Sequence, residues 1–313
     1  MTHEARDVVV TKRVQHAHGV AGLTLADPSG AALPEWQPGA HIDLMLPDGR
    51  VRQYSLCGSD GAAWNVAVLN APDGRGGSAW IHDNIHEGDV IRIRGPRNKF
   101  PLAPAQRYVF IAGGIGITPI IAMVRELEQR GNSNWRLTYG GRSRSSMAFL
   151  DELEAMGEQV TVTPQDESGL IDIQVALGQP QIGTAVYCCG PEPLLQAIDR
   201  ACRSWPPGTL HVERFTPVEI DTAGDSAFEV VAERSGITLT VPASVSILDA
   251  LADQGVYVAT SCGEGVCGTC ETKVLEGEVD HRDSLLSEQE RAANTVMMVC
   301  CSRARGARLV LDV

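Results

Sequence analysis

The chain has 313 residues, which is more than one typical hydrophobic core and predicts two or three domains. Its formal net charge of −13 at pH 7 argues against nucleic acid and anionic membrane surfaces as partners. No apolar run approaches the roughly 18 residues of a membrane span. Nine cysteines without a recognisable secretion signal favour a reducing cytoplasm, where we expect a monomer.

The first hundred residues contain short apolar runs separated by Gly, Pro and Asp turns. This rhythm is typical of a small antiparallel β-barrel. The predicted strands lie at residues 8–10, 23–25, 41–46, 51–56 and 64–69.

Two stretches of this region together predict a clamp for a flavin phosphate. The strand at 51–56 carries Arg52, Tyr54 and Ser55, which offer a cation, a stacking surface and a hydroxyl. The run Gly74-Arg75-Gly76-Gly77-Ser78 predicts a turn into a short helix, whose first amides and Ser78 hydroxyl would bind an anion. Taken alone, the first stretch could be an ordinary barrel strand, and the second could be a flexible surface turn.

Residues 96–102 are predicted to be a linker, and strands and helices alternate beyond them. A buried strand at 108–112 runs into Gly113-Gly114-Ile115-Gly116-Ile117-Thr118-Pro119, and a helix follows at 120–130. Strand, glycine turn and helix form a cradle for a dinucleotide pyrophosphate. Glycine-rich turns are nevertheless common, and this one is not the G-x-G-x-x-G fingerprint.

Further strand and helix units indicate an α/β sheet. The turn Cys189-Gly190-Pro191 follows a predicted strand, at the edge where open α/β sheets bind ligands. A small buried core residue is the alternative for Cys189. The predicted strands are 136–139, 160–163, 185–189 and 210–215, and the predicted helices are 148–156 and 194–202.

Four cysteines predict an iron–sulfur cluster in the last part of the chain. Cys262, Cys267, Cys270 and Cys300 have the spacing C-x4-C-x2-C-x29-C, which is that of a plant-type [2Fe–2S] cluster. Glycines at 263, 265 and 268 allow the loop to bend and turn its amides toward sulfur. A zinc site would typically show two short paired spacings, and disulfides would suggest secretion, so both alternatives are weaker.

The same C-terminal region is predicted to be a separate α+β domain. A polar linker at 217–226 precedes it, and a hairpin opens it. The predicted strands are 228–233, 237–241, 272–275, 296–299 and 309–313, with one helix at 246–254.

Taken in this order, the motifs resemble those of the phthalate dioxygenase reductase family, closest to reductases of the vanillate O-demethylase kind. The resemblance covers almost the whole chain. Besides the cluster cysteines, it rests on the residues 52–55, 74–78, 113–119, 139–143, 189–191, 213–215 and 300–304.

This resemblance implies a multidomain fold. An antiparallel β-barrel flavin domain would take residues 1–103 and an α/β parallel-sheet nucleotide domain residues 104–218. An α+β plant-type ferredoxin of the β-grasp kind would take residues 227–313. It also implies the cofactors: FMN rather than FAD, NADH and a [2Fe–2S] cluster.

Site residues are implied position by position. Thr118, Cys189 and Phe215 would lie at the reacting rings as catalytic residues. Leu69 departs from the pattern, since some members carry a basic residue there, and Cys301 stands where valine is usual. The cofactor-binding residues would be Arg52, Gln53, Tyr54, Ser55, Ala67, Val68, Leu69, Gly76, Gly77 and Ser78 for FMN, and Gly113, Gly114, Gly116, Thr118, Pro119, Arg142, Ser143, Cys189, Gly190, Pro191 and Phe215 for the nucleotide and its contact with the flavin.

The implied function is that of an NADH-dependent reductase. It would take a hydride from NADH onto FMN and pass single electrons through the cluster to a separate terminal oxygenase of the Rieske type, acting on an aromatic acid or ether. A haem-thiolate cytochrome monooxygenase or another acceptor is an alternative partner, and a non-enzymatic iron–sulfur sensor is an alternative class. Arg142 and Arg144 follow the second strand, where an arginine can favour NADPH, whereas the resemblance favours NADH.

Overall fold

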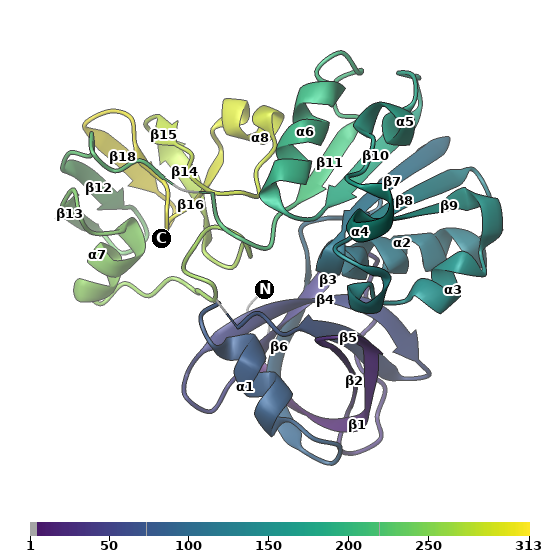
Figure 1. The fold of residues 1–313 in the computed structure, drawn as a ribbon. Coiled ribbons are helices and arrows are strands. Elements are labelled where there is room, and N and C mark those ends of the chain that lie inside the picture. The colour runs from purple at the N-terminus through teal and green to yellow at the C-terminus, as the bar shows by residue number, and fades with distance from the viewer. Residues whose placement is uncertain (1–4, 73, 219) are drawn as a thin grey trace. The chain divides into compact units, whose positions relative to one another are not determined.

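The computed structural model describes residues 5–72, 74–218 and 220–313. The chain divides into two compact units, one ending at Glu213 and the other running from Arg214 to Val313 (Figure 1). The barrel and the parallel sheet both belong to the first unit. The three-domain boundaries remain a prediction, and Glu219, in the predicted linker at 217–226, lies outside the described residues.

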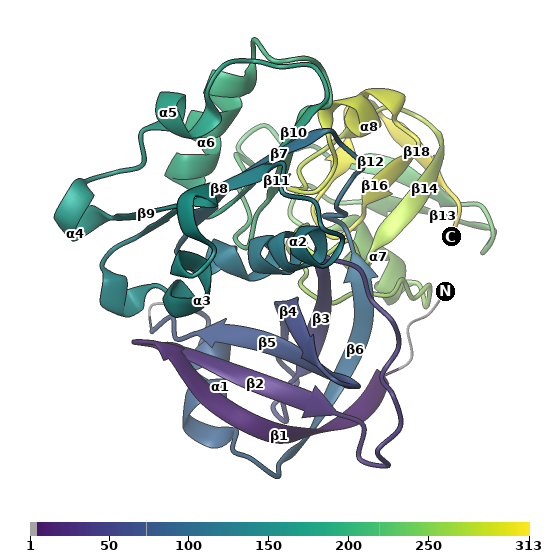
Figure 2. The ribbon, with the colours of Figure 1, turned by 90° about the vertical axis from the view of Figure 1, so that its right-hand side faces the viewer.

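The N-terminal region is a closed antiparallel barrel with the strand order β1-β2-β5-β4-β3-β6 (Figure 2). Its interior contains Leu25, Ile42 and Trp64, each at most 2% exposed, and one helix adds Ile81 to this core. The elements are β1 (Ala5–Ala17), β2 (Val20–Ala26), β3 (Ala40–Met45), β4 (Val51–Asp60), β5 (Ala63–Leu69), α1 (Gly77–Asn84) and β6 (Val90–Asn98).

The five strands predicted for this region are confirmed, but the linker predicted at 96–102 begins too early. Residues 96–98 belong to β6, where Arg97 pairs with His41 and Asn98 with Ala40. The pairing of β3 with β6 shifts register between His41 and Asp43. Proline is tolerated at such an irregularity because it has no N–H to donate to the ladder.

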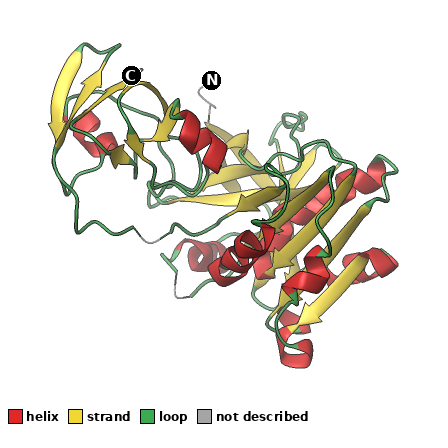
Figure 3. Cartoon of the chain, turned by 90° about the horizontal axis from the view of Figure 1, so that it is seen from above, coloured by secondary structure: helices red, strands yellow, loops and turns green. Residues whose placement is uncertain are grey.

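A five-stranded parallel sheet of order β11-β10-β7-β8-β9 forms the rest of the first unit, with helices on both faces (Figure 3). Side chains of α2 and α3 pack on one face, and those of α5 and α6 on the other. The strands are β7 (Arg107–Gly113), β8 (Trp135–Gly141), β9 (Val160–Pro164), β10 (Thr184–Cys189) and β11 (Leu210–Glu213). The helices are α2 (Ile117–Gln129), α3 (Leu150–Glu154), α4 (Gln165–Ser168), α5 (Ile173–Leu177) and α6 (Glu192–Cys202), and three 3₁₀ turns are η1 (Gly114–Gly116), η2 (Arg144–Ser146) and η3 (Gly157–Gln159).

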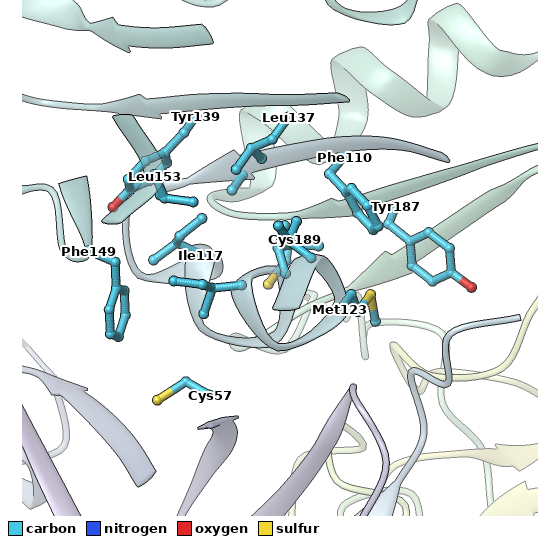
Figure 4. Close-up of a cluster of buried hydrophobic side chains, with 14 of the residues drawn as sticks. Cys57, Phe110, Ile117, Met123, Leu137, Tyr139, Phe149, Leu153, Tyr187 and Cys189 are labelled. Carbon is cyan, nitrogen blue, oxygen red and sulfur yellow. The ribbon is translucent and has the colours of Figure 1, made fainter. Parts of the chain in front are cut away.

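Helix α2 joins the sheet to the barrel. Ile117 and Met123 lie between Phe110 and Leu137 of the sheet and Cys57 of the barrel (Figure 4). Arg125 of α2 also donates to the carbonyl of Cys57 and forms a two-bond ion pair with Glu152. One continuous apolar core therefore holds the barrel and the sheet together.

Three predicted elements of this region differ from the structure at their ends. Helix α2 begins at Ile117 rather than residue 120, because proline is tolerated in a first helical turn. Helix α3 is shorter than the predicted 148–156, because Phe149 has a φ of 63° and cannot continue a helix. Strand β11 ends at Glu213, so Arg214 and Phe215 lie beyond it.

The C-terminal unit is a mixed sheet of order β13-β12-β18-β14-β16 with α7 packed against it. Ser246 caps α7 by accepting from the Asp249 amide at 3.0 Å, and Ile247 and Leu251 enter the core. The elements are β12 (Phe228–Ala232), β13 (Ile237–Val241), α7 (Ile247–Asp253), β14 (Glu271–Glu276), β15 (Val279–Asp280), α8 (Glu288–Ala293), β16 (Val296–Met298), β17 (Arg303–Ala304) and β18 (Arg308–Leu311). The small β15–β17 pair and α8 were not predicted.

This architecture agrees with the predicted fold class: an antiparallel barrel, a parallel-sheet α/β region and an α+β region with a mixed sheet. Among the described residues, no helix combines the length and the apolar character that crossing a membrane requires.

Candidate functional site

The N-terminus of α1, strand β4 and the turn before that strand together form a cationic cradle. Arg52 and Arg50 both donate to the carbonyl of Arg75, at 2.9 Å and 3.2 Å. A Cβ on Gly77 would lie 2.4 Å from Nε of Arg52, and one on Gly76 would lie 2.8 Å from a guanidinium nitrogen of Arg50. The two glycines therefore allow the arginines to approach the first turn of α1, which suits a phosphate group.

Other predicted flavin residues lie on neighbouring strands of the barrel. Gln53 donates to Asp43 at 3.0 Å, and Ser55 is buried. Burial also raises the pKa of the Tyr54 phenol, so this ring remains neutral. On β5, Ala67 and Val68 are buried and Leu69 is 37% exposed, while Ser78 on α1 accepts from the Ala71 amide at 3.1 Å.

Asp43 is a supporting residue that the sequence analysis missed. Its side chain is fully buried and pairs with Arg94 at 3.2 Å and Arg97 at 2.5 Å. Through Gln53 this carboxylate positions the predicted flavin strand. The available signal was a charged residue inside the apolar run 41–46.

The structure brings the two predicted nucleotide turns together, backbone against backbone. A Cβ on Gly116 would lie 2.2 Å from the carbonyl oxygen of Cys189, and one on Gly190 would lie 3.0 Å from the Cα of Gly113. Pro191 follows as the N-cap of α6. Glycine is therefore required at this contact because any side chain would separate the carboxyl ends of β7 and β10.

Two of the three predicted catalytic residues lie in or directly after these turns. Thr118 is 2% exposed and donates to the Ile115 carbonyl at 3.0 Å, which fixes its hydroxyl. Cys189 is completely buried, and burial raises the pKa of its thiol far above the usual value. Cys189 is therefore a neutral thiol and not a nucleophile. Phe215, 41% exposed, belongs to the other compact unit, so its approach to a flavin remains a prediction.

The loop after β8 carries the residues predicted to contact the adenosine part. Ser143 caps η2 in a reciprocal arrangement with Ser146, and Arg142 is exposed. Arg144 donates two hydrogen bonds to Glu154, at 2.8 Å and 2.6 Å, and lies 3.9 Å from Glu167. Its charge is therefore already matched by carboxylates.

The cluster loop has the bent backbone that four thiolate ligands require. Glycines 263, 265 and 268 have φ values of 72°, 72° and 71°, which favour glycine. The Glu264 amide donates to the Cys262 sulfur at 3.3 Å. Contact with the Cys267 thiol, and with that of Cys300, lowers the pKa of Cys262. Cys267, Cys270 and Cys300 are buried, while Cys262 is partly exposed, so the described loop fits a [2Fe–2S] cluster near the surface.

Comparisons with protein families agree with this geometry. A model of an oxidoreductase NAD-binding domain matches residues 110–200. A model of a 2Fe-2S iron-sulfur cluster binding domain matches residues 230–305. The two matches coincide with the parallel-sheet region and with the C-terminal unit.

Similar proteins extend the match to nearly the full chain. A putative toluene-4-sulfonate monooxygenase system reductase subunit from Comamonas testosteroni is 44% identical over 304 residues, 95% of either chain. The solved structure of a phthalate dioxygenase reductase is 36% identical with a TM-score of 0.72, over 99% of this chain and 98% of that one. An intact type IV self-sufficient cytochrome P450 monooxygenase is 46% identical with a TM-score of 0.92, and the chain spans 41% of its length.

Fold, turns and cluster loop thus define an NADH-dependent electron-transfer oxidoreductase with an NAD-binding domain and a [2Fe–2S] domain. The chain belongs to the phthalate dioxygenase reductase family, since it is 36% identical to that reductase over almost the whole length of both.

Proposed function

We propose that the chain is the reductase component of a two-component Rieske-type oxygenase system. It takes a hydride from NADH onto FMN and passes single electrons through the [2Fe–2S] cluster to a terminal oxygenase that acts on an aromatic acid or ether. The observation that carries this proposal is the presence, in one chain, of the cationic cradle on α1, the paired glycine turns and the four-cysteine loop. The similar toluene-4-sulfonate reductase subunit is named for an aromatic acid.

Different residues of this chain would bind the nucleotide, line the nicotinamide site and hold the cluster. Amides of the turn at 113–116 would bind the pyrophosphate beside the N-terminus of α2. Thr118 and Cys189 would lie beneath the backbone at the nicotinamide site, where their buried, neutral side chains place no charge next to the ring. Bound FMN would supply the conversion of one two-electron transfer into two one-electron transfers. Cys262, Cys267, Cys270 and Cys300 would hold the cluster.

FMN is the proposed flavin, and the cationic cradle supports it. Arg50 and Arg52 meet the first turn of α1, where a terminal phosphate would accept from guanidinium and amide donors together. Mass spectrometry of the flavin released by denaturation tests this proposal. FMN alone is the expected product, and FAD would contradict it.

A cytochrome partner is the second candidate, and one comparison favours it. The match to a self-sufficient cytochrome P450 monooxygenase covers 99% of this chain but only part of the monooxygenase. To distinguish the two candidate partners, the chain is reduced anaerobically with NADH and then combined with either a Rieske oxygenase or a haem-thiolate cytochrome. We expect NADH oxidation coupled to product formation with a Rieske oxygenase. Coupled turnover with a haem-thiolate cytochrome alone would favour the second candidate, and failure of NADH to bleach the flavin would favour the sensor.

We also propose a cytoplasmic location. None of the nine cysteines, all of them among the described residues, forms a disulfide, which suits a reducing compartment. Fractionation of cells that express the chain, with detection by antibody, tests this location.

A further inference from the structure

Three polar side chains of the C-terminal unit are buried without complete hydrogen bonding. They are His281, Asp283 and Ser284, in the segment after β15. The His281 side chain is 6% exposed, and that of Asp283 is completely buried. Both ring nitrogens of His281, Oδ2 of Asp283 and the Ser284 hydroxyl have no hydrogen-bond partner among the described residues. Such groups destabilise a fold, so their grouping in one place calls for a functional explanation.

This segment is attached to both parts of the chain that carry the cluster cysteines. The Ser284 amide donates to the carbonyl of Gly265, inside the cluster loop, at 3.0 Å. A Cβ on Gly265 would lie 3.0 Å from the Cα of Asp283. On the other side, the Arg282 amide donates at 3.1 Å to the hydroxyl of Ser302, two residues after the fourth cysteine. The segment therefore contacts the cluster loop on one side and the residues after the fourth cysteine on the other.

Three charged side chains influence the imidazole of His281: those of Asp283, Arg291 and Arg305. Asp283 is on the same segment, with Oδ2 3.8 Å from Nδ1 of His281. Arg291 of α8 lies 3.9 Å from Oδ1 of Asp283, and Arg305 follows β17 and pairs with Glu278 at 3.2 Å. Burial is the largest influence and lowers the pKa of His281; Asp283 raises it, and Arg291 and Arg305 lower it further. The imidazole is therefore neutral at neutral pH while no extra negative charge is nearby.

We propose that His281 and Asp283 form a proton-binding site coupled to the redox state of the cluster. His281 binds one proton from solvent when the cluster gains one electron, and it releases that proton when the electron leaves. The electron comes from the flavin in turnover, the proton adds to a ring nitrogen, and no other bond forms or breaks. The inference rests on the proposed function in that the four cysteines hold the cluster.

The physical basis is electrostatic. One added negative charge in a poorly solvated region favours the protonated form of a neighbouring base. Asp283 stabilises the imidazolium that results, and it is too far from the ring for a direct hydrogen bond in the neutral state. Since the proton accompanies the electron, a low pH favours the reduced cluster.

An EPR-monitored potentiometric titration of the full-length, iron-loaded protein tests the coupling. Dithionite reduces the cluster, and the midpoint potential is measured from about pH 5 to about pH 8. His281 has one pKa beside the oxidised cluster and a higher one beside the reduced cluster. Between these two pKa values we expect the potential to fall by about 59 mV for each pH unit, the one-electron equivalent of a tenfold change. Above the higher pKa the potential should not depend on pH.

Two substitutions assign the effect to this pair. His281→Gln removes the proton acceptor and should abolish the pH dependence with unchanged iron content. Asp283→Asn keeps an oxygen that can accept from the Leu285 and Leu286 amides, as Asp283 does at 3.0 Å and 2.7 Å. This variant should move the pH range in which the potential changes to lower pH. His281 is the one histidine in the sequence 214–313. His16→Gln, in the first unit, is the matched control and should keep the slope.

A wild-type potential that is independent of pH would overturn the inference, as would a slope that persists in His281→Gln. If His281→Gln does not fold, the inference is overturned by an Asp283→Asn variant whose potential changes over the same pH range as that of the wild-type protein. Absence of any [2Fe–2S] signal in the wild-type protein would instead contradict the proposed function. The two failures are therefore distinguishable without an oxygenase or NADH.

Discussion

The four cysteines with cluster spacing are predicted to differ in role from the neighbouring thiol of Cys301. In Cys267→Ser we expect most of the iron to be lost while the flavin stays bound, because a buried cluster ligand is replaced by a weaker one. Iron analysis and EPR measure the first effect, and flavin absorbance the second. Cys301→Ser is the control and should be nearly silent. Full iron content and an unchanged EPR signal in Cys267→Ser would refute the assignment.

Arg52 is predicted to be the main cation for the flavin phosphate. Arg52→Gln should weaken FMN binding about 10- to 100-fold, since a hydrogen bond to a charged group contributes about 1.5–3 kcal/mol. Fluorescence quenching of FMN measures this affinity. Arg50→Gln is the comparison and should weaken binding less, because Arg50 is already paired with Asp48 through a 2.7 Å hydrogen bond. An equal loss in both variants would show that the two arginines share the role.

At the scale of elements, the contact between the turns after β7 and β10 depends on the absence of a side chain. Gly116→Ala should lower the free energy of unfolding by about 1–3 kcal/mol and slow NADH oxidation, because its Cβ would meet the Cys189 carbonyl. Gly114→Ala is the comparison. Its Cβ would face open space and only the φ of 55° is strained, so we expect a loss of about 1 kcal/mol. Urea unfolding that ranks Gly114→Ala as the more damaging change would contradict this account.

The loop after β8 and helix α3 together are predicted to set the nicotinamide preference. We expect a larger kcat/KM for NADH than for NADPH, because Glu154 and Glu167 surround the guanidinium of Arg144. Glu154→Gln should raise kcat/KM for NADPH several-fold by making Arg144 available to a 2′-phosphate. Steady-state kinetics with both nucleotides measure the ratio. A wild-type preference for NADPH would show that the carboxylates do not neutralise Arg144.

For the whole molecule, the predicted route of electrons ends in the C-terminal unit. A chain cut within the linker at 217–226 should still reduce ferricyanide with NADH, because the first unit has its own cores and carries all predicted nucleotide and flavin residues except Phe215. It should fail to support a terminal oxygenase. Oxygenase turnover by the truncated chain at the full-length rate would show that the cluster is not on the route.

The intact reductase is predicted to dock its oxygenase through the acidic surface of the ferredoxin unit. Coupled turnover should therefore fall as ionic strength rises, because salt screens charges that steer association. Titration with NaCl at fixed oxygenase concentration measures this effect, and ferricyanide reduction by the truncated chain is the control. The candidate residues are exposed or partly exposed: Glu264, Glu271, Glu276, Glu278 and Asp280.

The sequence by itself determined the fold class and the kind of chemistry. Strand periodicity, glycine turns and cysteine spacing are local signals, because each depends on residues that are neighbours along the chain. For the same reason, Thr118 and Cys189 were predicted separately, each from its own turn. Element ends were less predictable: the φ of Phe149 and the pairing of residues 96–98 depend on distant neighbours.

Only the tertiary structure decided which of these signals meet. The backbone contact of Gly116 with Cys189, the Asp43 carboxylate beneath Gln53 and the carboxylates around Arg144 each join segments from different elements. The buried His281 and Asp283 had no motif at all, because two polar residues in a loop are ordinary until burial removes their water. Whether a side chain is buried, and which groups it contacts, depends on how distant segments pack together. A single sequence does not contain that information in any local pattern.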